Sequence, residues 1–145
     1  MESRIIAVIR VRGPIDVRPE TRMTMNLLRL TRRNHCVLIN EKSQKTSLRG
    51  MLIKCKDYVT WGAVNKDIIK LVLEKRGRIE GDKKPSKEQI ETALKAIEKG
   101  ERSDIKPVFR LHPPRKGWKS MKHRFPKGAL GPRGEKMSEL LKKMV

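Results

Sequence analysis

The residues best suited to chemistry lie in one basic segment, residues 106–134. It contains nine lysines and arginines, two histidines and no acidic residue, and it includes Phe109, Trp118 and Phe125. Like charges at this spacing repel one another, so we expect a partner that brings closely spaced negative charge, such as a phosphate backbone. The aromatic side chains suit that partner, because unstacked RNA bases lie on aromatic rings and guanidinium planes. A solubilising tail is the alternative, but such a tail would not need Trp118 and Phe125.

Catalytic chemistry has much weaker support in this sequence. His35 beside Cys36 could suggest a thiol nucleophile or a metal ligand, but Cys36 opens a short apolar run and no second ligand pair lies at a suitable spacing. The segment GALGPRG (128–134) lacks the glycine and lysine order of a P-loop, and the acidic side chains form no recognisable acid and base pair. We therefore expect a protein that is not an enzyme and needs no metal, cofactor or small-molecule substrate.

The overall charge points to the same class of partner. The chain has 36 basic and 16 acidic residues in 145, a formal charge of +20, which favours nucleic acid over an anionic membrane surface. No run of 18 apolar residues occurs, and the start, MESRIIAVIR, lacks the pattern of a secretory signal, so we expect no membrane and a cytosolic protein. Cys36 and Cys55 fit neither a disulfide framework nor a zinc site, and we expect buried, reduced thiols.

The charge divides the chain into four parts. Residues 1–61 carry a net charge of +8 and nine of their thirteen basic residues are arginine, whereas residues 62–105 carry only +2. Because arginine binds phosphate in a bidentate way and stacks on bases, the first part is expected to present a binding surface. We predict a core domain at 1–61, a helical extension at 62–105, a basic arm at 106–134 and a C-terminal helix at 135–145.

The first part has the pattern of a small α+β domain. Residues 4–11 are apolar on both faces, which is typical of a central strand. Residues 36–39 and 58–61 predict two more strands, the last of them ended by Gly62. Helices are predicted at about 19–32 and from 46 or 47 to 55. Their core stripes are expected to be Met23, Leu27 and Leu30 in the first helix, and Leu48, Met51, Leu52 and Cys55 in the second.

Three more helices are predicted in the rest of the chain. Asn65 and Gly77 bracket a largely apolar helix at 66–76, and Ser86 with Gln89 predicts a capping box before a helix that ends at Gly100. The last helix places Met137, Leu140, Leu141 and Met144 on one face. The basic arm, interrupted by prolines and glycines, is expected to be irregular and mostly extended, without paired strands.

Several strings in this order resemble a known family. The strings GPIDVRPETRMTMNLLRLTRRN (13–34), TSLRGMLIKCKDYVTWG (46–62) and RLHPPRKGWK with GALGPRG (110–134) are similar to the large-subunit ribosomal proteins of the L-thirty family, in their longer archaeal and eukaryotic form, which includes eukaryotic L-seven. The resemblance covers essentially the whole chain. It implies a ferredoxin-like β-α-β-α-β core with a three-stranded antiparallel sheet of order 3-1-2 and two helices on one face. It also implies a place in the ribosome, on large-subunit rRNA near 5S rRNA, among neighbouring ribosomal proteins, without catalysis.

We expect rRNA to be bound on two surfaces, mainly through its shape, because A-form RNA hides its base edges in a deep, narrow groove. Trp61 is expected to pack in the core instead. A free-standing RNA-binding regulator or RNA chaperone is the alternative with the same charge features. The predicted rRNA-binding residues are, in the core, Arg12, Arg18, Arg22, Arg32, Arg33, Asn34, Lys45 and Arg49, and, in the arm, Arg110, His112, Arg115, Lys116, Trp118, Lys119, Lys122, His123, Arg124, Lys127 and Arg133.

Overall fold

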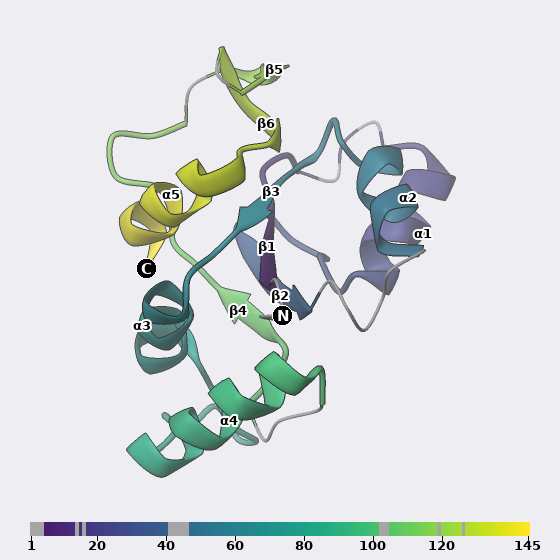
Figure 1. Ribbon diagram of the computed structural model, residues 1–145. Coiled ribbons are helices and arrows are strands. Elements are labelled where there is room, and N and C mark those ends of the chain that lie inside the picture. The colour runs from purple at the N-terminus through teal and green to yellow at the C-terminus, as the bar shows by residue number, and fades with distance from the viewer. Residues whose placement is uncertain are drawn as a thin grey trace.

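The computed structural model describes residues 5–13, 15, 17–40, 47–101, 105–118, 120–125 and 127–145, with only the backbone of residues 47, 121, 122 and 135 (Figure 1). Within these residues, six strands form one sheet in the order β4-β2-β1-β3-β6-β5. The strands are β1 (Ile5–Arg10), β2 (His35–Asn40), β3 (Val59–Ala63), β4 (Val108–Arg110), β5 (Ser120–Arg124) and β6 (Gly128–Pro132). The helices are α1 (Pro19–Leu27), α2 (Ser47–Lys54), α3 (Lys66–Arg76), α4 (Lys87–Lys99), the short 3-10 helix η1 (Gly134–Lys136) and α5 (Met137–Met144).

The mixed α+β class is confirmed, whereas the expected count of three strands is wrong. β1 pairs antiparallel with both β2 and β3, so that Ala7 lies opposite Leu38 on one side and Gly62 on the other. Three further strands, all from residues 106–134, extend this central unit at both edges. The sequence pattern missed β4 and β6 because the strands that they join, β2 and β3, lie far away in the chain, and β5 pairs only with β6.

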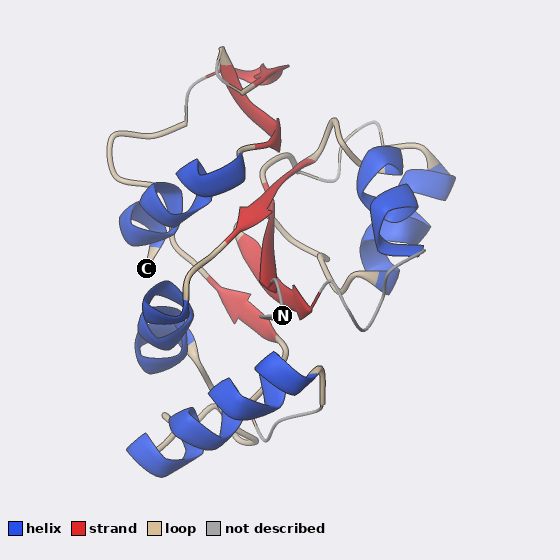
Figure 2. Ribbon diagram, in the orientation of Figure 1, coloured by secondary structure: helices blue, strands red, loops and turns tan. Residues whose placement is uncertain are grey.

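Helices cover both faces of the sheet (Figure 2). On one face, α1 and α2 pack over Val8, with Met25 and Leu52 in the same buried cluster. On the other face, α3, α4 and α5 pack over Ile9, with Leu73 and Leu141 in a second cluster. Because both of its faces are buried in this way, β1 is the central strand that its apolar sequence predicts.

α1 begins at Pro19 as predicted but ends at Leu27, five residues earlier than expected. Two of its predicted core residues are on the outside: Met23 is 67% exposed and Leu27 is 70% exposed, while Met25 and Leu30 are fully buried. Arg29 adopts a left-handed conformation with φ of 64°, which breaks the helix. Leu30 therefore lies beyond the helix, and its seven-residue spacing from Met23 does not place the two on one face.

Gly62 lies inside β3 and does not end it, contrary to prediction. A Cβ at this position would lie 2.5 Å from the carbonyl oxygen of Gly134 and 2.7 Å from Cβ of Met137. Glycine is required here because η1 and α5 approach the strand so closely. Trp61 beside it packs partly buried against the α1 and α2 cluster, in agreement with the core role expected for it.

The later helices follow the sequence pattern closely. α3 spans the predicted residues, and the capping box of Ser86 and Gln89 is present at the start of α4. The four apolar residues predicted for the last helix are all buried in α5. No helix within the described residues is long and apolar enough to cross a membrane.

The basic arm was expected to be irregular, and this is wrong for much of its length. β4 pairs antiparallel with β2, where Phe109 lies opposite Cys36, and β6 pairs parallel with β3, where Gly131 lies opposite Thr60. Pro107 lies just before β4, and Pro132 is the last residue of β6. These prolines therefore leave the interior of each strand free to pair.

Candidate nucleic-acid interface

Most of the predicted RNA-binding side chains in the described residues are on the surface. Arg18, Arg22, Arg32, Arg33, Arg49, Arg110, Arg115, Lys116, His123, Arg124 and Lys127 are exposed, and Arg12, Asn34, His112, Trp118 and Arg133 are half-buried. Lys45 and Lys119 lie outside the described residues, and Lys122 is described only by its backbone.

A buried arginine organises the core part of this surface. Arg10 is only 3% exposed, and its guanidinium donates to the carbonyl oxygens of Leu30 at 2.8 Å and Arg12 at 3.0 Å. Burial, with the nearby charge of Arg22, lowers its pKa from the usual value. Arg10 thus joins the end of β1 to the loop after α1, the segment that carries Arg32 and Arg33. The sequence pattern did not single it out, because it ends an otherwise apolar strand.

Two other predicted residues are held by the fold. The guanidinium of Arg12 lies 5.2 Å from the ring centre of Tyr58, which fixes its direction beyond the end of β1. Asn34 has a φ of 63°, and its backbone N–H donates to Arg10 while its carbonyl accepts from Leu111. Its side-chain oxygen is buried without a hydrogen bond to any described residue. The geometry of Asn34 therefore serves the junction between β1 and β4.

The tertiary structure divides the basic arm between the two edges of the sheet. Arg110 ends β4 at one edge, whereas Arg124 ends β5 at the other, with four strands between them. Figure 1 shows β4 and β5 far apart on either side of β1 and β3. The arm is continuous in sequence but forms two separate basic regions in space.

At the β5 edge, Arg133 makes most of its contacts within the protein. Its guanidinium donates to the hydroxyl of Thr60 at 2.9 Å and to the carbonyl of Ala129 at 3.0 Å. Its guanidinium carbon lies 5.2 Å from the ring centre of Phe125 and 6.0 Å from that of Trp118. Burial lowers the pKa of Arg133. These contacts make Arg133 a link between β3 and the β5–β6 segment, and they engage both aromatic rings that the sequence singled out.

His112 is also engaged by neighbouring backbone. Its Nδ1 lies 2.6 Å from the carbonyl oxygen of Pro113, and its Nε2 lies 3.2 Å from an oxygen of Val145. The next exposed cations, Arg115 and Lys116, are held close to α5, because the N–H of Arg115 donates to the carbonyl of Lys143 at 3.3 Å. This turn presents its two cations beside the last helix.

At the β4 edge, the structure brings together cations that the sequence analysis did not assign to RNA. A hollow of about 710 Å³ is lined by Arg29, Arg76, Arg78, Lys106 and the predicted Arg110; we call it the β4 pocket. The half-buried His35 also lines it. Burial first, and then the charges of Arg110, Arg32 and Arg10, lower the pKa of His35 below its usual 6.5. The sequence signal for this pocket was weak, because its residues come from distant segments of the chain.

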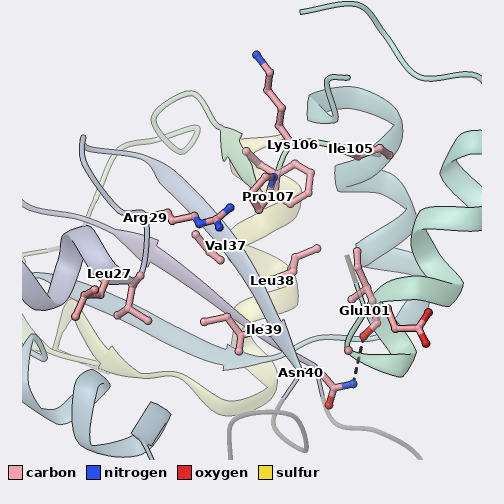
Figure 3. Close-up of a pocket in the computed structure, with 14 residues that line it drawn as sticks. Leu27, Arg29, Val37, Leu38, Ile39, Asn40, Glu101, Ile105, Lys106 and Pro107 are labelled. Atoms are coloured by element: carbon pink, nitrogen blue, oxygen red, sulfur yellow. Dashed lines mark hydrogen bonds between the residues drawn. The ribbon is translucent and has the colours of Figure 1, made fainter. Parts of the chain in front are cut away.

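A second hollow, lined by both apolar and polar residues, adjoins the β4 pocket (Figure 3). It has a volume of about 420 Å³, and its walls include Leu27, Ile39 and Phe109. Arg29, Lys106 and Pro107 line both hollows and so form their shared boundary. The exposed Leu27, which the helix pattern placed in the core, is part of this surface.

Nucleophilic or metal chemistry finds no support in the described part of the chain. Both cysteines are free and buried, and burial raises the pKa of Cys36 to about 12 and that of Cys55 to about 11. The thiolate form that a nucleophile requires is thus strongly disfavoured. Among the described residues, no group of three or more histidine, cysteine or acidic side chains could hold a metal ion.

Comparison with known proteins identifies close relatives of the chain. The family model described as Ribosomal protein L30p/L7e matches residues 6–59. The chain is 43% identical to the large ribosomal subunit protein uL30 of Archaeoglobus fulgidus, over 97% of this chain and 99% of that protein. It is 44% identical to the protein of the same name from Methanococcus maripaludis and 37% identical to that from Methanocella arvoryzae, each over at least 95% of both chains.

Proposed function

The chain belongs to the Ribosomal protein L30p/L7e family, and from this premise we propose that it is a structural component of the large ribosomal subunit that binds and stabilises large-subunit rRNA. We place it near 5S rRNA and among neighbouring ribosomal proteins, in the cytoplasm. The family is one of ribosomal proteins and not of enzymes, so no catalytic step is assigned to the chain.

One observation carries this proposal: the similarity to proteins of the large subunit extends over nearly the whole chain. Residues 106–145 are therefore part of what is shared, including the segment that has nine basic residues and no acidic one. A charge of +20 would be unfavourable in a small protein on its own, and it suits a partner of dense negative charge.

We propose that each of the four parts of the chain has its own structural or binding role. Residues 1–61 act as a ferredoxin-like core that presents the arginines around β1 and α1, and residues 62–105 act as a helical support. Residues 106–134 supply a second binding surface, and residues 135–145 attach that segment to the core. The predicted rRNA-binding residues named above are the proposed contacts.

Within this set, the contacts described above suggest two roles. Exposed cations such as Arg18, Arg32 and Arg124 are placed to bind phosphate directly. Arg133 is instead placed to hold the arm against Thr60, so that its effect on RNA binding is mainly indirect. Recognition of RNA shape requires such fixed positions, because the cations must match phosphates whose spacing is set by the RNA.

The binding should depend strongly on salt. If about six to ten phosphates are contacted, affinity for rRNA should fall by about 10³ to 10⁵ between 50 and 200 mM salt, and by less where the RNA is single-stranded. The measurement is a titration of transcribed large-subunit rRNA with the purified protein at several salt concentrations. A flat response would contradict an interface that rests on phosphate contacts.

A wash of purified ribosomal subunits with increasing salt tests residence on the ribosome. A structural component should stay on the large subunit at one copy per particle until high salt releases it with other large-subunit proteins. Loose, substoichiometric exchange at low salt would instead favour a free-standing RNA-binding regulator or chaperone, and would refute the structural role.

A further inference from the structure

The β4 pocket gathers an unusual amount of one charge. Its five cations come from four separate segments: the turn after α1, the end of α3, the loop that follows α3, and the segment that includes β4. The single carboxylate in its lining, Asp82, is paired with Lys106 at 2.8 Å. Both partners are well exposed, so the pair is weak and leaves the pocket strongly positive.

Arg29 directly follows the C-cap residue of α1 and lines the β4 pocket. Its φ of 64° lies in the left-handed region that favours glycine or asparagine. An exposed arginine there costs about 1 kcal/mol relative to glycine and adds to the repulsion with Arg76 and Arg110. This conformation closes the end of α1, because the N–H of Arg29 donates to the carbonyl of Asn26 and the N–H of Leu30 donates to that of Met25. The guanidinium of Arg29 itself has no hydrogen bond to another described residue, so its charge is available to a partner outside the chain.

The chemistry of the lining matches a folded phosphate backbone. One guanidinium group can bind two oxygens of a phosphate at the same time. The hollow is large enough for more than one phosphate group. Asn26, Thr31 and His35 add neutral hydrogen-bonding groups at the same site, which suit 2'-hydroxyls. The apolar part of the adjoining hollow, formed by residues such as Leu27 and Ile39, offers a surface for an unstacked base (Figure 3).

We propose that the β4 pocket is an RNA-binding site which holds two or more phosphate groups of a sharply folded rRNA segment. This inference rests on the proposed function, and it adds Arg29, Arg76, Arg78 and Lys106 to the residues that bind RNA. It also makes the β4 edge a binding site independent of the β5 edge. An acidic segment of a neighbouring protein would be the other class of partner, but it would leave the apolar part of the adjoining hollow without a role.

The test uses two paired variants with the same loss of charge. The pocket variant combines Arg29→Gly with Arg76→Gln, neither of which belongs to the surfaces predicted from sequence. The control variant combines Lys70→Gln with Lys95→Gln, two exposed lysines on α3 and α4. Binding of each variant to transcribed large-subunit rRNA of Archaeoglobus fulgidus is measured from 50 to 200 mM salt, beside an arm variant with Arg124 and Lys127 both changed to Gln.

The pocket variant should bind at least about tenfold more weakly than wild type, because it lacks two charge-assisted phosphate contacts. Its slope of log affinity against log salt should be smaller by about 1.4 to 1.8. The control variant should stay within about twofold of wild type. A pocket variant that behaves like the control overturns this inference and leaves the proposed function intact if the arm variant still loses affinity. A wild-type protein that does not bind the rRNA would refute both.

Loss of folding cannot produce the expected result. Arg29→Gly replaces a strained residue by the one best suited to its backbone, so the pocket variant should unfold at no lower urea concentration than wild type. A photo-reactive residue in place of Asn26, tested in reconstituted large subunits, then identifies the partner. Cross-links to rRNA support the inference, whereas cross-links only to a protein, or to neither, overturn it.

Discussion

Cations at the two edges of the sheet differ in how far the protein itself engages them. At the β5 edge, Arg133 is half-buried and its guanidinium is satisfied by Thr60, Ala129 and two aromatic rings. At the β4 edge, Arg78 donates to the carbonyls of Gly77 and Lys75, and Lys106 pairs with Asp82. The guanidinium groups of Arg29, Arg76 and Arg110 in the same pocket have no hydrogen bond to any described residue. The composition of a basic segment therefore does not decide which of its cations bind within the protein and which remain for a partner. Burial demands partners from within the protein, and exposure leaves the charge for a partner outside it.

The largest expected effect comes from the close contact between β3 and the η1–α5 segment that follows β6. Gly62→Ala should lower the free energy of unfolding by about 3 kcal/mol, because its Cβ would meet the backbone of Gly134 and the Cβ of Met137, neither of which can move easily. Urea unfolding measures this change.

The matched control is Gly50→Ala in α2, where no atom lies within 4 Å of the added Cβ. That variant should be neutral or slightly stabilising, because alanine is the better helix former. If Gly62→Ala also leaves stability unchanged, the packing of η1 and α5 against β3 is not as tight as described.

A smaller loss is expected when the internal role of Arg133 is removed. Arg133→Ala should cost about 2 kcal/mol of stability, because it deletes two hydrogen bonds from a charged group and its stacking on two rings. Lys127→Ala, an exposed cation of the same edge, should change stability by less than about 0.5 kcal/mol.

Urea unfolding of both variants checks this contrast between an internal and an external cation. Equal effects of Arg133→Ala and Lys127→Ala would remove the distinction between the two kinds of cation. Arg133→Lys should recover little of the loss, since lysine lacks the planar fork that reaches Thr60 and Ala129 together.

The smallest effect is a pKa change at the β4 edge. Burial, and then Arg110, lower the pKa of His35 in the folded protein. The unfolded chain therefore binds more protons than the folded one as pH falls below about 7, so His35 reduces stability toward acid pH and has no such effect above its unfolded pKa of about 6.5.

Arg110→Gln should raise the pKa of His35 toward its usual value, and Lys95→Gln should leave it unchanged, as followed by NMR titration of the imidazole. An unchanged pKa in the Arg110 variant would show that the cations of this edge do not act on the pocket together.

The sequence predicted those parts of the fold whose signals are local. The capping box at Ser86 and the boundaries of α3 follow from residues within a few positions of one another. The central place of β1 follows from its apolar character on both faces. The predicted stripe of Met23 and Leu27 failed because α1 buries the face of Thr21, Thr24 and Met25 instead. Leu30 was misplaced because the left-handed Arg29 ends the helix before it, which periodicity does not predict.

For the candidate RNA surface, the sequence predicted the types of residue better than it predicted where they lie in the fold. Exposed cations such as Arg18 and Arg124 could be named from charge alone, because lysine and arginine are rarely buried. The internal roles of Arg10 and Arg133 could not, since each depends on acceptors that distant segments supply. Arg76 was not assigned to RNA because residues 62–105 carry a net charge of only +2 and were interpreted as a helical extension.

By itself, the amino-acid sequence predicted nucleic acid as the class of partner and no catalytic chemistry, and it determined the helices with clear amphipathic patterns, since these depend on composition and on neighbours along the chain. Only the tertiary structure decided that residues 106–134 add strands to both edges of the sheet, and that cations from four segments meet in one pocket. The physical reason is that both features bring together residues from distant parts of the chain, and these residues come into contact only when the whole core has packed.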